Sequence, residues 1–232
     1  MPFLPCFDMT KEKILSTLNL TLLRAAGGDE ITALCDNALD FGCASVCVPP
    51  CYVKYAAEYV NNAIPISTII GFPFGFETTE SKCFQAENAI SNGASEIDIM
   101  INLGRFESKD YGYVINEIRS VKKVCGNKPL KVVVEIPQLS LDNKLRACNL
   151  VSESGADYIK TSTLFSDYTA TETDISLLSD FIKNGIGIEA TGKILYPTQA
   201  EALLFCGATR IGTSDRIIQI MKSRSSKNTA KE

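Results

Sequence analysis

The segment SGADYIKT at residues 154–161 returns in altered form three more times along the chain. The related segments are FGCASVCV (41–48), NGASEIDIM (92–100) and CGATRIGT (206–213). Each places a glycine and small residues before a strand-like run, and amphipathic stretches such as DNKLRACNLVSE (142–153) precede them. A glycine at this point can adopt the left-handed conformation that ends a helix. The repeat therefore predicts a regular alternation of helices and strands.

Three further short apolar runs lie between the repeats, and a fourth precedes them, which raises the number of strand candidates to eight. They are Thr17–Leu22, Ile66–Gly71, Leu130–Ile136 and Gly185–Ala190. Parallel strands need crossover helices, so alternating β and α units predict an α/β fold with a parallel sheet. Eight units favour a closed (β/α)8 TIM barrel, and the absence of GxGxxG after the first strand weakens an open dinucleotide-binding sheet. We expect one barrel domain over 1–222 and a polar, disordered tail over 223–232.

Composition narrows the function further. The 232 residues carry 23 basic and 27 acidic side chains, a net charge of −4, so nucleic acid and anionic membranes are poor partners. There is no histidine, which excludes Ser-His-Asp catalysis and histidine-ligated zinc. The longest largely apolar stretch, 64–76, is too short and interrupted for a membrane span. The nine cysteines form no CxxC pair, and no apolar leader is seen, so we expect reduced thiols in a cytoplasmic protein.

Four charged residues interrupt the apolar strand runs: Asp98, Glu135, Lys160 and Glu189. Active sites of such barrels lie at the carboxyl ends of the strands, and burying a charge is costly unless it is paired. A desolvated Lys160 is a candidate amine nucleophile that forms a Schiff base with a carbonyl. Asp98 is a candidate proton-transfer partner. The alternatives are a lysine that reaches solvent from a strand end and an aspartate in a structural ion pair.

Several motifs together resemble the deoxyribose-phosphate aldolase family. They are ASVCVPPCYV (44–53), IIGFPFGFETTESK (69–82), GASEIDIMINLGRF (93–106), KVVVEI (131–136), GADYIKTSTLFS (155–166) and GATRIGTS (207–214). Their order and spacing match the family over most of the chain. The resemblance implies a class I aldolase on a TIM barrel, without a metal or other cofactor. The implied reaction is reversible cleavage of 2-deoxy-D-ribose 5-phosphate to D-glyceraldehyde 3-phosphate and acetaldehyde.

The resemblance also assigns roles to individual residues. Lys160 matches the Schiff-base lysine, Asp98 matches the acid/base aspartate, and Cys47 matches a cysteine near the substrate pocket, although a small buried residue explains Cys47 equally well. A small aldehyde or sugar phosphate is the implied partner, and the family's frequent dimers make a homodimer possible. The implied substrate and phosphate contacts are Thr161, Gly192, Lys193, Gly212 and Ser214.

The match to the family breaks down at five positions near the chemistry. Glu189 stands where relatives carry a second lysine, which reverses a charge expected to lower the pKa of the nucleophile. Leu164 and Lys193 replace glycines, Asp215 replaces a serine, and Asn19 replaces an aspartate. Leu164 and Asp215 disfavour a phosphate, whereas Lys193 could contact one or supply part of the missing positive charge.

Two hypotheses follow. The first is an active Schiff-base aldolase, with reduced activity or an altered substrate. The second is a catalytically impaired homologue that binds a ligand or a protein partner. Glu189 decides between them in part, because it could pair with Lys160 and suppress the reaction or pair with Lys193 and leave Lys160 free.

Overall fold

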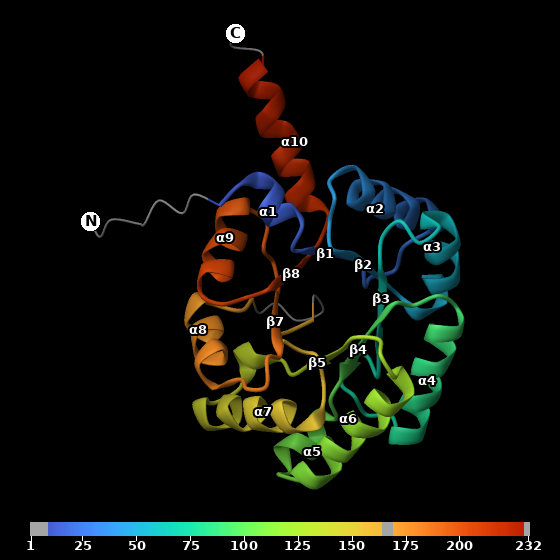
Figure 1. The fold of residues 1–232 in the computed structure, drawn as a ribbon, viewed down its shortest axis with the longest axis vertical. Coiled ribbons are helices and arrows are strands. Elements are labelled where there is room, and N and C mark those ends of the chain that lie inside the picture. Colours follow the sequence, from blue (N-terminus) through green and yellow to red (C-terminus); the bar gives the residue numbers. More distant parts are fainter. Residues whose placement is uncertain (1–8, 164–168, 230–232) are drawn as a thin grey trace, which may run out of the picture.

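The computed structural model describes residues 9–163 and 169–229, and at its centre is a closed barrel of parallel strands (Figure 1). Each strand pairs with the next along the chain, and the last pairs with the first. The strands are β1 (Leu18–Thr21), β2 (Ser45–Val48), β3 (Ile66–Ile70), β4 (Glu96–Met100), β5 (Leu130–Val133), β6 (Tyr158–Lys160), β7 (Gly187–Thr191) and β8 (Arg210–Thr213). The predicted (β/α)8 barrel and all eight predicted strands are confirmed.

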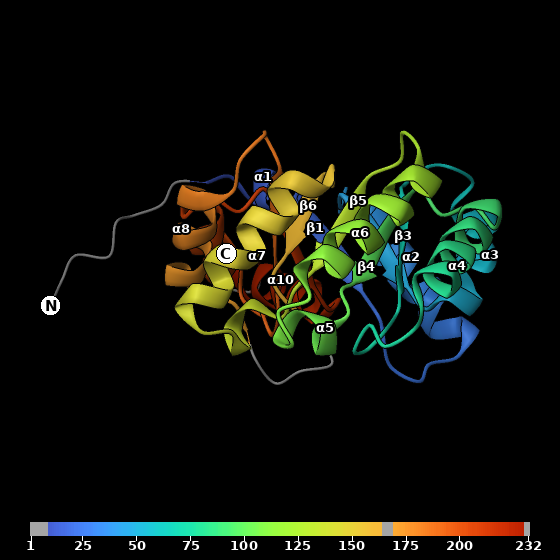
Figure 2. The same ribbon diagram turned by 90° about the horizontal axis from the view of Figure 1, so that it is seen from below.

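Helices follow the strands in turn and form a ring around the barrel, seen end-on in Figure 1 and edge-on in Figure 2. One longer helix follows each strand: α2 (Gly28–Asp40), α3 (Val53–Val60), α4 (Thr79–Ser91), α6 (Tyr111–Cys125), α7 (Leu141–Ser154), α8 (Glu172–Phe181), α9 (Pro197–Phe205) and α10 (Arg216–Thr229). The short elements are α1 (Lys11–Leu15), α5 (Leu103–Glu107), η1 (Pro50–Tyr52) and η2 (Ile136–Gln138). Among the described residues, no helix combines the length and apolar character needed to span a bilayer.

The helices bury one apolar face against the outside of the barrel. In α2 the buried side chains are Ile31, Leu34, Cys35 and Ala38, which recur at helical spacing. They join a core that includes outward-facing strand residues such as Ile97. The glycines at 42, 93, 155 and 207 have φ of 61°, 104°, 84° and 113°, so the left-handed helix ends inferred from the repeat are confirmed.

The other face of each strand points into the barrel. Strand register aligns Asp98 with Lys131, Lys160 with Glu189, and Asn19 with Gly212. Because side chains alternate along a strand, these residues fall at one level of the barrel interior. The sheet therefore brings together charges that lie far apart in the sequence.

The end of the chain differs from the expectation of a disordered polar tail. Helix α10 continues to Thr229, so the backbone of residues 223–229 is helical. Composition had favoured disorder because this segment is polar. Residues 230–232 lie outside the described part of the chain, so the expectation for them remains a prediction.

Candidate active site

Two lysines and two carboxylates alternate in a closed arrangement inside the barrel. Lys160 Nζ lies 2.6 Å from Asp98 Oδ2 and 2.9 Å from Glu189 Oε1. Lys131 Nζ lies 2.9 Å from Glu189 Oε2 and 3.5 Å from Asp98 Oδ1. All four side chains are at most 2% exposed. We call these four residues the charged ring.

Neutral side chains complete the ring by donating hydrogen bonds to its carboxylates. Ser67 Oγ donates to Asp98 Oδ1 at 2.9 Å, and Asn19 Nδ2 donates to Glu189 Oε1 at 3.0 Å. Gly212 faces the ring from β8, where a Cβ atom would lie only 2.8 Å from Glu189 Oε1. The missing side chain of Gly212 therefore provides the space that Glu189 occupies.

A further ion-pair layer lies on the amino-terminal side of the ring. Lys131 Nζ also contacts Glu96 Oε2 at 2.8 Å, and Arg210 Nη1 lies 2.6 Å from the same oxygen. The Arg210 guanidinium lies over the Tyr158 ring. Counting both layers, the interior contains equal numbers of cations and anions, so most of the buried charge is compensated. The cations are Lys131, Lys160 and Arg210, and the anions are Glu96, Asp98 and Glu189.

This charge pattern sets the protonation of the ring. Burial opposes the charge of Lys160, but the adjacent Asp98 and Glu189 outweigh burial and raise the pKa of Lys160 well above its ordinary value. Burial also opposes the charge of Glu189 and would raise its pKa. The adjacent Lys131 and Lys160 outweigh burial and hold the pKa of Glu189 well below its usual range. Lys160 is therefore an ammonium ion at neutral pH in the free protein. Of the two pairings considered for Glu189, the one with Lys160 is observed.

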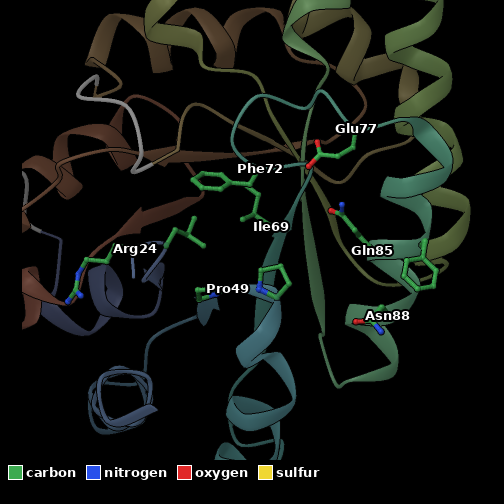
Figure 3. A pocket seen from close by; sticks show the side chains of 10 residues that line it. Arg24, Pro49, Ile69, Phe72, Glu77, Gln85 and Asn88 are labelled. Atoms are coloured by element: carbon green, nitrogen blue, oxygen red, sulfur yellow. The ribbon is translucent and has the colours of Figure 1, made fainter. Parts of the chain in front are cut away.

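The interior becomes asymmetric toward the carboxyl ends of the strands. On one side Ile69, Met100 and Val133 form an apolar cluster against which Leu23 and Phe72 pack. A pocket of about 440 Å³ adjoins this side, and Ile69 and Phe72 lie next to each other on its wall (Figure 3). Its remaining lining residues are Leu23, Arg24, Pro49, Pro50, Glu77, Phe84, Gln85 and Asn88.

On the other side hydroxyl groups follow Lys160 and join β6 to β7. Thr161 Oγ1 accepts a hydrogen bond from Thr191 N at 2.9 Å, and Ser162 Oγ donates to Thr191 O at 2.7 Å. Glu135 adopts a left-handed conformation after β5, and its Oε1 accepts from Thr163 N at 2.7 Å. Glu135, singled out for its charge, thus holds the segment that follows Lys160 rather than joining the ring.

Of the other residues predicted to contact the substrate or its phosphate, all but Gly212 lie just after β7 or β8. Gly192 and Lys193 directly follow β7, and Ser214 directly follows β8. Gly212 lies within β8, beside the ring. Asp215 Oδ2 accepts from Gln219 Nε2 at 3.0 Å at the start of α10. Leu164 lies outside the described residues.

Cys47 is buried beside the ring. Burial, followed by the charge of Asp98, raises the pKa of its thiol to about 12. It is therefore a neutral thiol at physiological pH. No group of three or more potential metal-ligating side chains occurs in the described part of the chain.

The family model for DeoC/LacD family aldolases matches residues 17–194. The chain belongs to this family. A deoxyribose-phosphate aldolase of Clostridioides difficile (strain 630) is 43% identical over 211 residues, covering 90% of this chain and 96% of that protein. One from Streptococcus pyogenes serotype M4 is 44% identical over 220 residues, covering 94% and 98%. This DeoC/LacD member is thus a class I aldolase, a carbon–carbon lyase.

Solved structures agree with this family assignment. The aldolase QR15 superposes with a TM-score of 0.86 at 31% identity, covering 91% of this chain and 97% of its own. The tetrameric deoxyribose phosphate aldolase from Aeropyrum pernix gives 0.85 at 25% identity, covering 94% and 93%. The resemblance seen in the motifs is confirmed.

Inspection of the sequence missed Lys131, which contacts more carboxylates than any other ring residue. It is the first residue of the run KVVVEI (131–136), and a lysine at the start of a strand is usually exposed to solvent. The register of the sheet aligns Lys131 with Asp98, so both side chains face the interior, and no sequence motif reveals that register. A second buried ion pair was also missed: Lys82 of α4 lies 2.9 Å from Glu117 of α6, and neither side chain is exposed.

Proposed function

We propose that this aldolase reversibly cleaves 2-deoxy-D-ribose 5-phosphate to acetaldehyde and D-glyceraldehyde 3-phosphate through a Schiff base on Lys160. The observation that carries the proposal is the 2.6 Å contact between Lys160 Nζ and Asp98 Oδ2 inside the barrel. It gives a buried amine a proton acceptor within hydrogen-bond distance. The names of the curated relatives supply the substrate.

The reaction begins with the ammonium form of Lys160. Asp98 accepts one proton, and the neutral amine attacks C1 of the open-chain aldehyde to give a carbinolamine. Asp98 returns the proton to the carbinolamine oxygen, which leaves as water, and an iminium remains. The C2–C3 bond then breaks as the C3 hydroxyl loses its proton, and the electron pair passes to the nitrogen as an enamine. Protonation at C2 and hydrolysis release acetaldehyde and regenerate Lys160.

The asymmetric interior supports one orientation of the substrate. The two-carbon donor fragment would lie toward Ile69 and Met100, and the hydroxylated fragment toward the β6–β8 side. We propose that Thr161, Gly192, Lys193 and Ser214 form the sugar-phosphate side, and that Gly212 contributes indirectly by leaving the space that Glu189 fills. Glycine-rich turns after the last strands of such barrels often bind phosphate through backbone N–H groups. Asp215 at the same end adds a negative charge, so we expect phosphate to contribute less to binding than a glycine- and serine-lined site would allow.

The test is reductive trapping of the purified protein. Acetaldehyde and deoxyribose 5-phosphate are each added with borohydride, the intact chain is weighed, and the modified residue is located by peptide mapping. We expect an adduct on Lys160 and none in Lys160→Ala, while the surface control Lys54→Ala keeps it. Folded protein without an adduct under either condition would favour the impaired homologue instead.

We propose two further properties, the compartment and the oligomeric state. All described cysteines are free, which supports a reducing, cytoplasmic setting. A homodimer is proposed from the family resemblance. Cell fractionation tests the first, and light scattering of the purified protein tests the second.

A further inference from the structure

Glu189 contacts Lys160 Nζ, the nitrogen that forms the proposed Schiff base. Glu189 Oε1 lies 2.9 Å from Lys160 Nζ, and Asp98 Oδ2 lies 2.6 Å from the same nitrogen. Glu189 and Asp98 are fully buried, and Lys160 is almost so. Charges in such an interior are poorly screened, so both carboxylates act on whatever charge this nitrogen carries.

The position of Glu189 is fixed from three sides. Asn19 donates to its Oε1, Lys131 lies 2.9 Å from its Oε2, and Gly212 leaves the space that it fills. The family pattern that this sequence resembles has aspartate in place of Asn19 and lysine in place of Glu189. With aspartate at position 19, the Glu189 carboxylate would face another carboxylate instead of an amide donor. The two departures therefore fit each other, and the carboxylate is held against the nitrogen.

The resting ammonium and the iminium carry the same positive charge on the nitrogen, whereas the enamine nitrogen is neutral. Iminium formation converts an ammonium and an aldehyde into an iminium and water, so the nitrogen is positive before and after. Enamine formation removes a proton from C2, or the C2–C3 bond breaks, and the electron pair neutralises the nitrogen. A carboxylate beside the nitrogen stabilises both cations but gives little to the neutral enamine.

We propose that Glu189 is a catalytic residue that stabilises the iminium relative to the enamine, so that the covalent iminium accumulates and the enamine-forming step limits turnover. This inference rests on the proposed Schiff-base function. A lysine at this position would act in the opposite direction by repelling the iminium cation.

The experiment measures both species with acetaldehyde as the probe. Borohydride trapping and intact mass give the fraction of chains present as iminium. Proton NMR in D₂O gives the rate at which the C2 hydrogens of acetaldehyde exchange, which requires the enamine. Their ratio, exchange per trapped iminium, isolates the step on which Glu189 acts.

In Glu189→Gln we expect this ratio to rise at least about tenfold, the factor that corresponds to one pKa unit at the nitrogen. Glu189→Asp keeps the charge but moves the carboxylate farther from Lys160 Nζ, so we expect a smaller rise in the ratio. This variant serves as the test if Glu189→Gln does not fold. The matched control is Glu117→Gln, a buried glutamate paired with Lys82, which should leave the ratio unchanged.

Different results would contradict the Schiff-base function of Lys160 and the role of Glu189. If the wild-type protein forms no adduct, the Schiff-base function fails. If it forms the adduct but the ratio stays within about twofold in the folded Glu189 variants, the function stands and the role of Glu189 is overturned. A similar rise in Glu117→Gln would also overturn it, because the effect would then follow from loss of any buried carboxylate.

Discussion

Replacing Lys131 by methionine tests the charge balance of the barrel interior. Lys131 Nζ contacts Glu96 at 2.8 Å, Glu189 at 2.9 Å and Asp98 at 3.5 Å. At an effective dielectric constant of about 20, each of the two shorter contacts has a gross Coulomb energy of about 6 kcal/mol. Most of that energy offsets the cost of burying the charges. Breaking a buried pair by removing one partner costs a net of about 3–5 kcal/mol, and we expect that loss for Lys131→Met.

The loss should depend on pH in a definite direction. In the wild-type protein the pKa of Glu189 is held low, so its stabilisation is full above the ordinary carboxyl pKa and is lost as pH falls. In Lys131→Met one carboxylate is left in excess, and its pKa rises above the value in the unfolded chain. The folded variant then binds more protons than the unfolded one, so its stability falls as pH rises, by up to about 1.4 kcal/mol per pH unit.

The assay is urea denaturation at pH 5, 7 and 8.5. For a chain of this size we also expect the melting temperature at neutral pH to fall by roughly 6–20 °C. The control is Lys131→Met combined with Glu189→Gln, which removes one charge of each sign and should recover part of the stability and abolish the added pH dependence. A loss that is equal at all three pH values, or no loss, would refute the charge balance described above.

Three other predictions concern the same interior. Because the pKa of Lys160 is raised by its two carboxylates, the rate of borohydride-trapped adduct formation should increase with pH from 6 to 9; a flat profile would contradict the ammonium assignment. Combining Asn19→Asp with Glu189→Lys should increase aldolase turnover at neutral pH by tenfold or more, whereas Glu189→Lys alone, which loses the contact to Lys131, should gain less and melt lower. Cys47 should resist iodoacetamide at pH 8 in the folded protein, as judged by peptide mass, since its thiol is buried and its pKa is about 12; rapid alkylation would show that the site opens.

The fold was accessible from sequence because its signals are local and repeated. A glycine that ends a helix and an apolar run that follows it specify one β/α unit, and eight such units leave little choice of architecture. The polar segment beyond residue 222 shows the limit of composition, because its backbone continues α10 where disorder was expected.

The candidate site was only partly accessible. Lys160, Asp98 and Glu189 could be found because each interrupts an apolar run, and the structure brings all three into contact. Lys131 lies at the beginning of its run, where nothing local distinguishes a buried lysine from an exposed one. The contact of Asn19 with Glu189 joins the first and seventh strands, so it follows from barrel closure and not from any motif.

The unlike sides of the barrel mouth bear on stereochemistry. An iminium or enamine on Lys160 is planar, and its two faces would meet different surroundings: aliphatic side chains from β3, β4 and β5 on one side, and the hydroxyl-bearing segment after β6 on the other. An incoming aldehyde that must keep its own hydroxyl groups hydrogen-bonded can approach from the second side only. The terminal carbon of the enamine carries two hydrogens, so the new stereocentre is the former aldehyde carbon. Its handedness depends on which face of the aldehyde is presented to the enamine, and the surface of the mouth that holds the hydroxyl groups would set that face.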